Sequence, residues 1–518
     1  MLNDIDSLHT DTHRVCDICI VGSGPAGISL ALEMIDSGKS VILLESGKDT
    51  FDQDTQNLYT GKIDEDLPPI PLTASRLRYF GGTSGHWAGN CGPLDMVDLE
   101  KRDWIKNSGW PISHDTLNKY YRKSHKILQL GPFDYSPNKW NKNGSEIFDF
   151  SDSTNIEHKI LQLSPLRFGS VYREKLKHAS NIDVIFNANL TYIHVNENYS
   201  NVTSIEVRSL NGTFISITPN KLVLATGGVE NARLLLNSGL DKRNPMIGRY
   251  FSFHPRIKTG TLFLKNSIDR KKSPYQWQSS NNTSIKNLLT LSYDVQRKLK
   301  IPNHAFSLNY TLNPSLEGYE ALKRLKQRSI GGHSFDGVMD DMVSFFGDIG
   351  AVSGQYMQRK NQGNSSTLSV ITYMDQIPNK ESKVTLQKNV DKLGMRKAHV
   401  KWKYYEEEKN MVKVFNTQLA IEIAKHNIGR MKIDEDILEN NHFEEMIRLE
   451  SGGGHQMGTT RMGQDMSDSV VDLNCKMHGI DNLYCLGSSV FPTTGWVNPT
   501  LTIVALSIRL ADYLKDKS

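Results

Sequence analysis

The order of apolar and polar positions predicts a β-α-β unit at the N-terminus. Two short apolar runs, Cys16–Val21 and Ser40–Leu44, flank a segment with helical spacing of apolar residues, Ile28–Asp36. Apolar runs of this length are typical of strands buried on both faces of a sheet. The glycine-rich segment Gly22–Gly27 joins the first strand to the helix. This order predicts a parallel, Rossmann-like sheet.

Strands also dominate the centre of the chain, and their pattern changes near residue 256. From Arg256 to about Asn440 they alternate apolar and polar residues, as in a sheet with one solvated face. This change predicts a second, α+β domain built on an antiparallel sheet and inserted into the first. The predicted strands lie at 184–186, 191–195, 203–207, 214–217, 221–225, 368–373, 383–386 and 398–402, and the predicted helices at 229–238, 406–426 and 500–514. Residues 317–366 are expected to hold two helices and a loose stretch, as a mobile lid or as a plain surface excursion.

Composition and charge narrow the classes of protein. The chain has 518 residues with 61 basic and 57 acidic side chains, and the net charge of +4 points to neither nucleic acid nor an anionic membrane. No apolar run is long enough to span a bilayer and the start has no leader pattern, so we expect a cytoplasmic protein. Five cysteines do not suggest a disulfide framework, and no residue set resembles a metal site. Cys16 and Cys19 have redox-motif spacing, but they lie in a predicted strand, whereas reactive thiols favour helix starts.

The glycine turn carries the strongest single motif. It matches the dinucleotide fingerprint, with a strand before it, a helix after it, and Glu45 placed 18 residues beyond Gly27 to reach a ribose hydroxyl. A plain β-α-β turn is the alternative. No second fingerprint follows, which favours FAD over NAD. The residues expected to bind this part of FAD are Gly22, Ser23, Gly24, Pro25, Ala26, Gly27, Glu45 and Ser46.

Two more glycine-rich loops are candidates for the cofactor site. The first lies within Arg78–Asn90, and its small residues would let backbone N–H groups approach a flat ring. The second follows the strand that ends at Ala225. A tight surface loop and a packed β-α turn are the respective alternatives. The expected cofactor-binding residues here are Gly82, Thr83, Ser84, His86, Trp87, Ala225, Thr226, Gly227 and Asn231.

Two polar residues near the C-terminus are the candidate catalytic pair. His455 follows three glycines, and Asn498 precedes Pro499 and a predicted helix from Thr500. Free N–H groups at the start of that helix would attract negative charge. A histidine flanked by glycine is more often structural than catalytic, so the role depends on the rest of the chain.

Taken together, these motifs resemble the glucose-methanol-choline (GMC) family of FAD oxidoreductases. Four blocks occur in the family's order, at 22–45, 81–90, 222–255 and 455–502, and Pro378–Leu386 is similar to a stretch of its substrate domain. The resemblance implies that His455 is the active-site base, that Asn498 is its partner, and that Gly487, Ser488, Asn498, Pro499 and Thr500 contact FAD. The segment Tyr484–Ser489 lacks an acid that many members carry. His86-Trp87 is similar to the pyranose 2-oxidases, in which the matching histidine is joined covalently to the flavin; a neutral histidine packed beside the ring is the alternative.

The resemblance implies oxidation of a CH–OH group. His455 would take the hydroxyl proton, Asn498 would hydrogen-bond the developing alkoxide, and the hydride would pass to flavin N5. A sugar, glycoside or polyol is favoured as substrate, with oxygen, a quinone or a redox protein as electron acceptor. The alternative is a flavin-containing lyase of the same family that uses His455 as acid and base. The expected parts are 1–110, 181–255 and 446–518 for the FAD-binding domain, 111–180 for a helical insertion on the substrate side, and 256–445 for the substrate domain.

Overall fold

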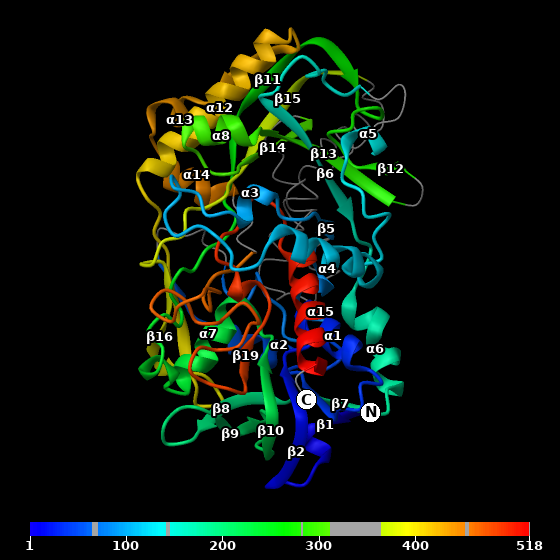
Figure 1. Cartoon of the computed structure of the whole chain (residues 1–518), viewed down its shortest axis with the longest axis vertical. Coiled ribbons are helices and arrows are strands. Elements are labelled where there is room, and N and C mark those ends of the chain that lie inside the picture. The colour runs from blue at the N-terminus through cyan, green and yellow to red at the C-terminus, as the bar shows by residue number, and fades with distance from the viewer. Residues whose placement is uncertain (65–70, 141–145, 281–282, 311–363, 451–454, 517–518) are drawn as a thin grey trace, which may run out of the picture.

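The computed structural model describes residues 1–64, 71–140, 146–280, 283–310, 364–450 and 455–516. Nearly all of the segment 317–366, expected to form either a mobile lid or a plain surface excursion, lies outside these residues, as do the three glycines before His455. Two large sheets organise the described chain, one toward each end of its long axis (Figure 1). The mixed α/β fold predicted from the sequence is confirmed.

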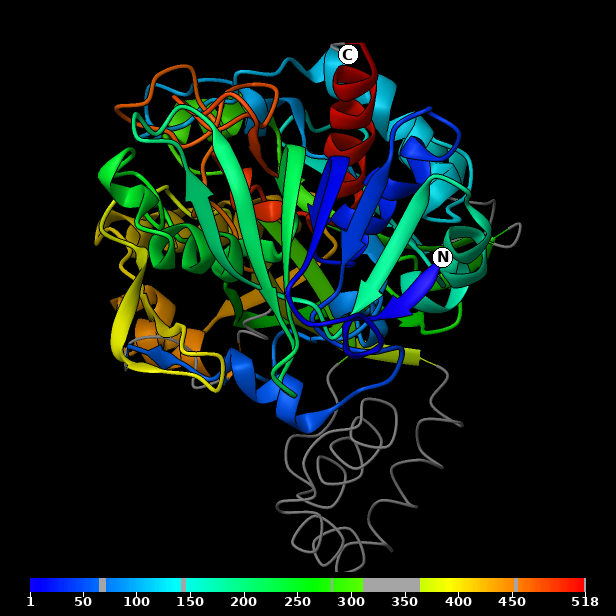
Figure 2. The ribbon, with the colours of Figure 1, turned by 90° about the horizontal axis from the view of Figure 1, so that it is seen from below.

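The first sheet contains the predicted β-α-β unit. Its strand order is β1-β7-β3-β2-β10-β9-β8, with β19 paired to β10, and its strands lie side by side in Figure 2. Strands β2, β3, β7 and β10 run parallel, while β8 and β9 add an antiparallel edge. The bounds are β1 Leu2–Asp4, β2 Thr12–Val21, β3 Val41–Leu44, β7 Ile182–Phe186, β8 Asn189–Val195, β9 Val202–Arg208, β10 Phe214–Leu224 and β19 Leu483–Cys485.

Helices cover this sheet and bring the two ends of the chain together. Helix α15 (Thr500–Asp516) packs against α1 (Pro25–Met34) and against α4 (His114–Ile127), as Figure 1 shows. Helices α6 (Phe168–His178) and α7 (Gly227–Asn237) lie beside the same sheet. The C-terminal helix start is thereby set next to the N-terminal glycine turn.

The second sheet is antiparallel, as predicted for the substrate domain. Its order is β18-β11-β15-β14-β13-β6-β5, with β12 paired to β13. The bounds are β5 Asn90–Cys91, β6 Ile156–Leu163, β11 Arg256–Asp269, β12 Gln278–Ser280, β13 Thr283–Leu291, β14 Ala305–Tyr310, β15 Asn364–Tyr373 and β18 Gly429–Ile433. Helix α12 (Glu407–Lys425) covers one face, where Phe415 stacks on Phe306. Strands β5 and β6 belong to this sheet although they precede residue 256.

Smaller elements complete the described chain. A three-stranded sheet, β16-β17-β4, joins Lys383–Val390, Arg396–Lys401 and Lys62–Ile63. The short helices are α2 Gln53–Gln56, α3 Met96–Leu99, α5 Pro137–Trp140, α8 Tyr293–Leu299, α13 Glu435–Glu439 and α14 Phe443–Glu450, and the 3₁₀ turns are η1 Ile5–Ser7, η2 Asn57–Tyr59, η3 Gly82–Gly85, η4 Leu240–Lys242 and η5 Ser488–Val490.

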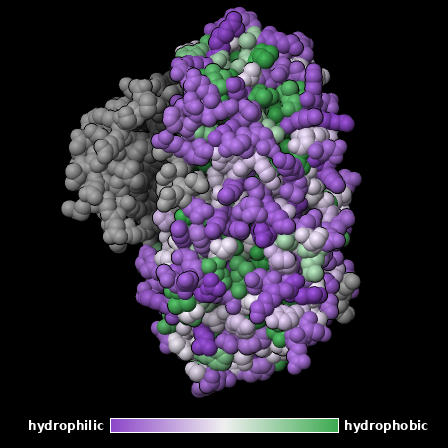
Figure 3. Space-filling model, turned by 90° about the vertical axis from the view of Figure 1, so that its left-hand side faces the viewer, coloured by the Kyte–Doolittle hydropathy of each residue, from purple (hydrophilic) through white to green (hydrophobic). Residues whose placement is uncertain are grey.

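The molecular surface in one view is largely polar, and the cysteines are buried. The face in Figure 3 is mainly hydrophilic, with hydrophobic residues scattered over it. No helix in the described ranges is both long and apolar enough to cross a membrane. All five cysteines are buried and unbridged. Burial raises the pKa of the Cys19 thiol well above its usual value, with a further contribution from Cys16, which disfavours a reactive thiolate there.

Candidate active site

A cavity of about 450 Å³ lies at the carboxyl ends of β2, β3 and β10. In open α/β sheets this is where ligands bind. Most of the residues singled out in the sequence line it: Gly22, Ser23, Gly24, Pro25, Ala26, Glu45, Ser46, Gly82, Thr83, Ser84, His86, Trp87, Ala225, Thr226, Gly227, His455, Gly487, Ser488, Asn498, Pro499 and Thr500.

Gly27 and Asn231, the two remaining predicted residues, lie behind the cavity wall. A Cβ at Gly27 would stand 1.8 Å from the carbonyl oxygen of Gly22, so glycine is needed there for the helix to pack on the turn. Asn231 accepts hydrogen bonds from the backbone N–H and hydroxyl of Thr226 and donates to the carbonyl of Leu486 and to Ser489 Oγ. Both residues shape the wall from behind.

The N-terminal turn presents polar backbone to the cavity. Helix α1 begins at Pro25, inside the motif and three residues before the predicted start, so its first-turn N–H groups face the strand ends. A Cβ at Gly24 would meet nothing within 4 Å, so the backbone there is open to an approaching group. Glu45 is buried at the end of β3 and accepts hydrogen bonds from the N–H groups of Ser23 and Gly47.

The loop around η3 forms another wall. Trp87 donates its Nε1–H to the carbonyl oxygen of Leu166 at 2.7 Å, which fixes the indole ring. His86 caps η3, with its backbone N–H donated to Thr83. Both side chains are partly exposed to the cavity.

His455 and Asn498 meet at one end of the cavity. Asn498 Nδ2 lies 3.2 Å from His455 Nε2. Asn498 is buried and His455 is partly exposed. The pairing predicted between these distant residues is present. Helix α15 starts two residues after Asn498, as predicted.

Two residues beside His455 were missed as site residues. His254 Nδ1 lies 3.0 Å from His455 Nδ1, and Arg256 lines the cavity and stacks over the ring of Tyr373. Burial lowers the pKa of His455 well below its usual value, and His254 and Arg256 lower it further. His455 is therefore neutral at neutral pH, as a proton acceptor must be. The signal that could have identified His254 in the sequence was its position before Pro255, at the end of the family-like block 222–255.

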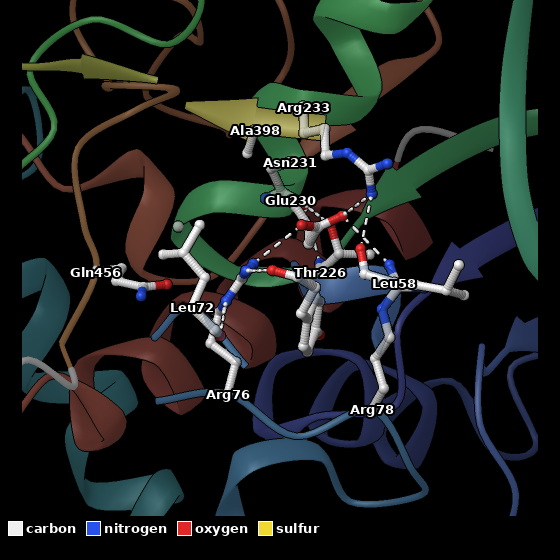
Figure 4. A network of polar contacts seen from close by, with 12 residues as sticks. Leu58, Leu72, Arg76, Arg78, Thr226, Glu230, Asn231, Arg233, Ala398 and Gln456 are labelled. Carbon is white, nitrogen blue, oxygen red and sulfur yellow. Dashed lines mark hydrogen bonds and ion pairs between the residues drawn. The ribbon is translucent and has the colours of Figure 1, made fainter. Parts of the chain in front are cut away.

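A buried ionic network supports another part of the cavity wall (Figure 4). Glu230 on α7 bonds Arg76 at 3.0 Å, Arg78 at 3.2 Å and Arg233 at 3.1 Å. Burial works to raise the pKa of Glu230, but Arg233, Arg76 and Arg78 outweigh it and lower this pKa to about 2. The network ties the segment before η3 to α7, and thus joins two walls of the cavity.

The fold and this cavity define a dinucleotide-binding α/β protein, and comparisons with known proteins narrow the class. Residues 170–256 and 378–507 match the two GMC oxidoreductase family models. A 2-methyl-1,2-propanediol dehydrogenase of Mycolicibacterium austroafricanum is 23% identical, with 96% of this chain and 95% of the relative covered. The fructose dehydrogenase large subunit of Gluconobacter japonicus is 21% identical, with 96% and 97% covered. A formate oxidase of Aspergillus oryzae, studied for the effect of a mutation on FAD modification, shares the fold with a TM-score of 0.58 at 15% identity, covering 98% of this chain and 99% of that one.

The chain belongs to the GMC oxidoreductase family and is an FAD-dependent oxidoreductase. A pyranose 2-oxidase of Tricholoma matsutake is 41% identical over 58 residues, which is 11% of this chain, so the match to this subgroup is only partial. The cavity fits FAD, because open glycine backbone, a buried acid and two helix starts line one continuous space.

Proposed function

We propose that this chain oxidises a CH–OH group of a small molecule, with a sugar, glycoside or polyol as the favoured substrate. Bound FAD supplies the hydride acceptor. The relatives named above carry a diol and fructose in their names, which supports this class. The acceptor, whether oxygen, a quinone or a redox protein, is left open, and a cytoplasmic location stays a prediction.

The contact between Asn498 and His455 carries the proposal. The amide Nδ2 can only donate, so His455 Nε2 accepts and holds the ring's lone pair. A substrate hydroxyl bound between these two groups would give its proton to Nε2 and receive a hydrogen bond from Asn498 as negative charge develops on its oxygen. The first-turn N–H groups of α15 would steady negative charge at the same end of the cavity.

A panel of sugars, glycosides, polyols and simple alcohols tests the reaction. Added without oxygen, a member of the correct class should bleach the flavin absorbance, and oxygen or a dye should then restore it. Conversion of a substrate with no change of absorbance would instead favour the lyase alternative. The restoring agent distinguishes an oxidase from a dehydrogenase.

Covalent attachment of FAD through His86 is a second hypothesis, supported by the position of His86 on the cavity wall. If FAD is attached covalently, acid precipitation should leave the yellow colour in the protein pellet. The His86→Ala variant should instead release the flavin to the supernatant. The matched variant Trp87→Phe changes the neighbouring ring but should keep the pellet yellow. Flavin that leaves the wild-type protein in acid would contradict the hypothesis.

A further inference from the structure

His254 contacts His455 at the ring nitrogen that does not face Asn498. The two Nδ1 atoms are 3.0 Å apart, and the rings are nearly perpendicular, at 85°. Two nitrogens at this distance share one hydrogen, so one Nδ1 donates and the other accepts. The direction of this bond decides which nitrogen of His455 is left to accept a proton.

The second nitrogen of His254 sets that direction. His254 Nε2 lies 3.3 Å from the backbone carbonyl oxygen of Thr494, which can only accept, so His254 Nε2 carries hydrogen. Burial, with a smaller contribution from Arg256, lowers the pKa of His254 to about 3, so the ring is neutral and its Nδ1 is bare. His455 Nδ1 must then donate, and neutral His455 keeps its lone pair on Nε2. This result does not depend on how the amide of Asn498 is oriented.

Thr494 is itself held in place. Its hydroxyl donates to Asp375 Oδ1 at 3.0 Å and accepts from the N–H of Gln376, and Asp375 forms a buried ion pair with Arg102. The hydrogen-bonded chain from His455 therefore ends at a fixed carbonyl oxygen. Because a carbonyl oxygen does not take up the proton, the arrangement orients His455 and does not relay protons away from it.

We propose that His254 is a positioning residue, which accepts the Nδ1–H of His455 and thereby keeps the proton-accepting lone pair on Nε2, beside Asn498. This inference rests on the proposed function of His455 as the base. It adds a role for a side chain 201 positions away in the sequence.

Three substitutions at one position test the inference. His254→Leu removes the acceptor, His254→Asn places a neutral oxygen near the site of Nδ1, and His254→Asp places a charged one there. Anaerobic flavin reduction should be about 10- to 100-fold slower in the leucine variant, because the Nδ1–H of His455 loses its partner and the other tautomer gains. The asparagine variant should recover most of the rate.

The pH dependence separates positioning from a merely structural role. His254 and Arg256 are the titratable or charged groups that act on His455. Arg256 is common to all variants, so the difference between His254→Asp and His254→Asn reports position 254 alone. The aspartate should raise the pKa of His455 and move the acid limb of the rate profile to higher pH.

His125 provides a matched control. It is a buried histidine of α4 whose ring nitrogens contact the carbonyl of Gly131 and the hydroxyl of Tyr135. His125→Leu should keep both the rate and the acid limb. A wild-type rate in His254→Leu, or superimposable limbs for the aspartate and asparagine variants, would overturn the inference; the second comparison decides alone if the leucine variant does not fold. If His455→Ala also reduces flavin normally, the proposed function fails; if only the His254 variants do, this inference alone fails.

Discussion

Replacing His455 by alanine should slow substrate-dependent reduction of the flavin by about 10²- to 10⁴-fold, the usual contribution of a general base. The protein should remain yellow, because the N-terminal turn and the loops that line most of the cavity are untouched. Stopped-flow absorbance under anaerobic conditions measures the rate directly. His455→Gln is the matched variant, since a carboxamide can hydrogen-bond but cannot serve as a base, and it should be as slow as the alanine variant.

The pH dependence of flavin reduction in the wild-type protein is a second test of the role of His455. Burial, His254 and Arg256 hold the pKa of His455 below its usual value, so the ring stays neutral as pH falls through 6.5. The rate of flavin reduction should therefore stay nearly constant from pH 8 to about 6. A near-normal rate in His455→Gln, or a wild-type rate that halves near pH 6.5, would contradict the assignment.

Local patterns predicted the cofactor side of the molecule well, because its signals lie within single segments. The turn at Gly22–Gly27 and the acid at Glu45 belong to one β-α-β unit, whose hydrophobic period and spacing are visible in the sequence.

The predicted break between the strands at 214–217 and 221–225 is absent, because one strand, β10, runs from Phe214 to Leu224. Strand β10 continues through Pro219, because β9 pairs only as far as Ile217 and β19 begins pairing only at Leu222, so no bond to a neighbour on that side is lost.

Contacts between distant segments could not be predicted in the same way. The role of His254 depends on the segment before β11 lying against the segment at His455, and no periodicity reports such proximity. Strand β6 was placed in a helical region, because its buried residues follow one another instead of alternating. The pairing of Asn498 with His455 was predicted from the order of the motifs along the chain and from the family resemblance, because their spacing in the sequence does not indicate a contact.

Removing the charge of Glu230 should destabilise the protein by about 3–5 kcal/mol, the usual effect of breaking a buried ion pair on one side. Glu230→Gln keeps the shape of the side chain but leaves Arg76 and Arg78 without the buried carboxylate that they share in Figure 4. Arg233 keeps its ion pair with Asp391. Urea unfolding followed by flavin fluorescence measures the loss, and FAD should be released earlier, because the network joins two walls of the cavity.

The pH dependence of the free energy of unfolding tests whether the charge of Glu230 causes the loss of stability. The pKa of Glu230 is lowered from 4.5 to about 2 in the folded protein, and this difference corresponds to about 3 kcal/mol of stability. Because this pKa is lower in the folded protein, the ionised Glu230 carboxylate stabilises the fold fully above pH 4.5. This stabilisation is lost as the pH falls toward 2 and the carboxylate takes up a proton. The gap between wild type and Glu230→Gln should therefore be constant from pH 8 to 5 and narrow below 4.5.

Glu206 offers the matched surface control. It pairs with His194 and Arg208 on the β8-β9 edge, and its side chain is 27% exposed. Glu206→Gln should cost less than about 1 kcal/mol, because exposed ion pairs are screened by water. Equal losses of stability in Glu230→Gln and Glu206→Gln would mean that the charge of the buried carboxylate does not join the cavity walls. A stability difference between wild type and Glu230→Gln that does not change with pH would mean the same.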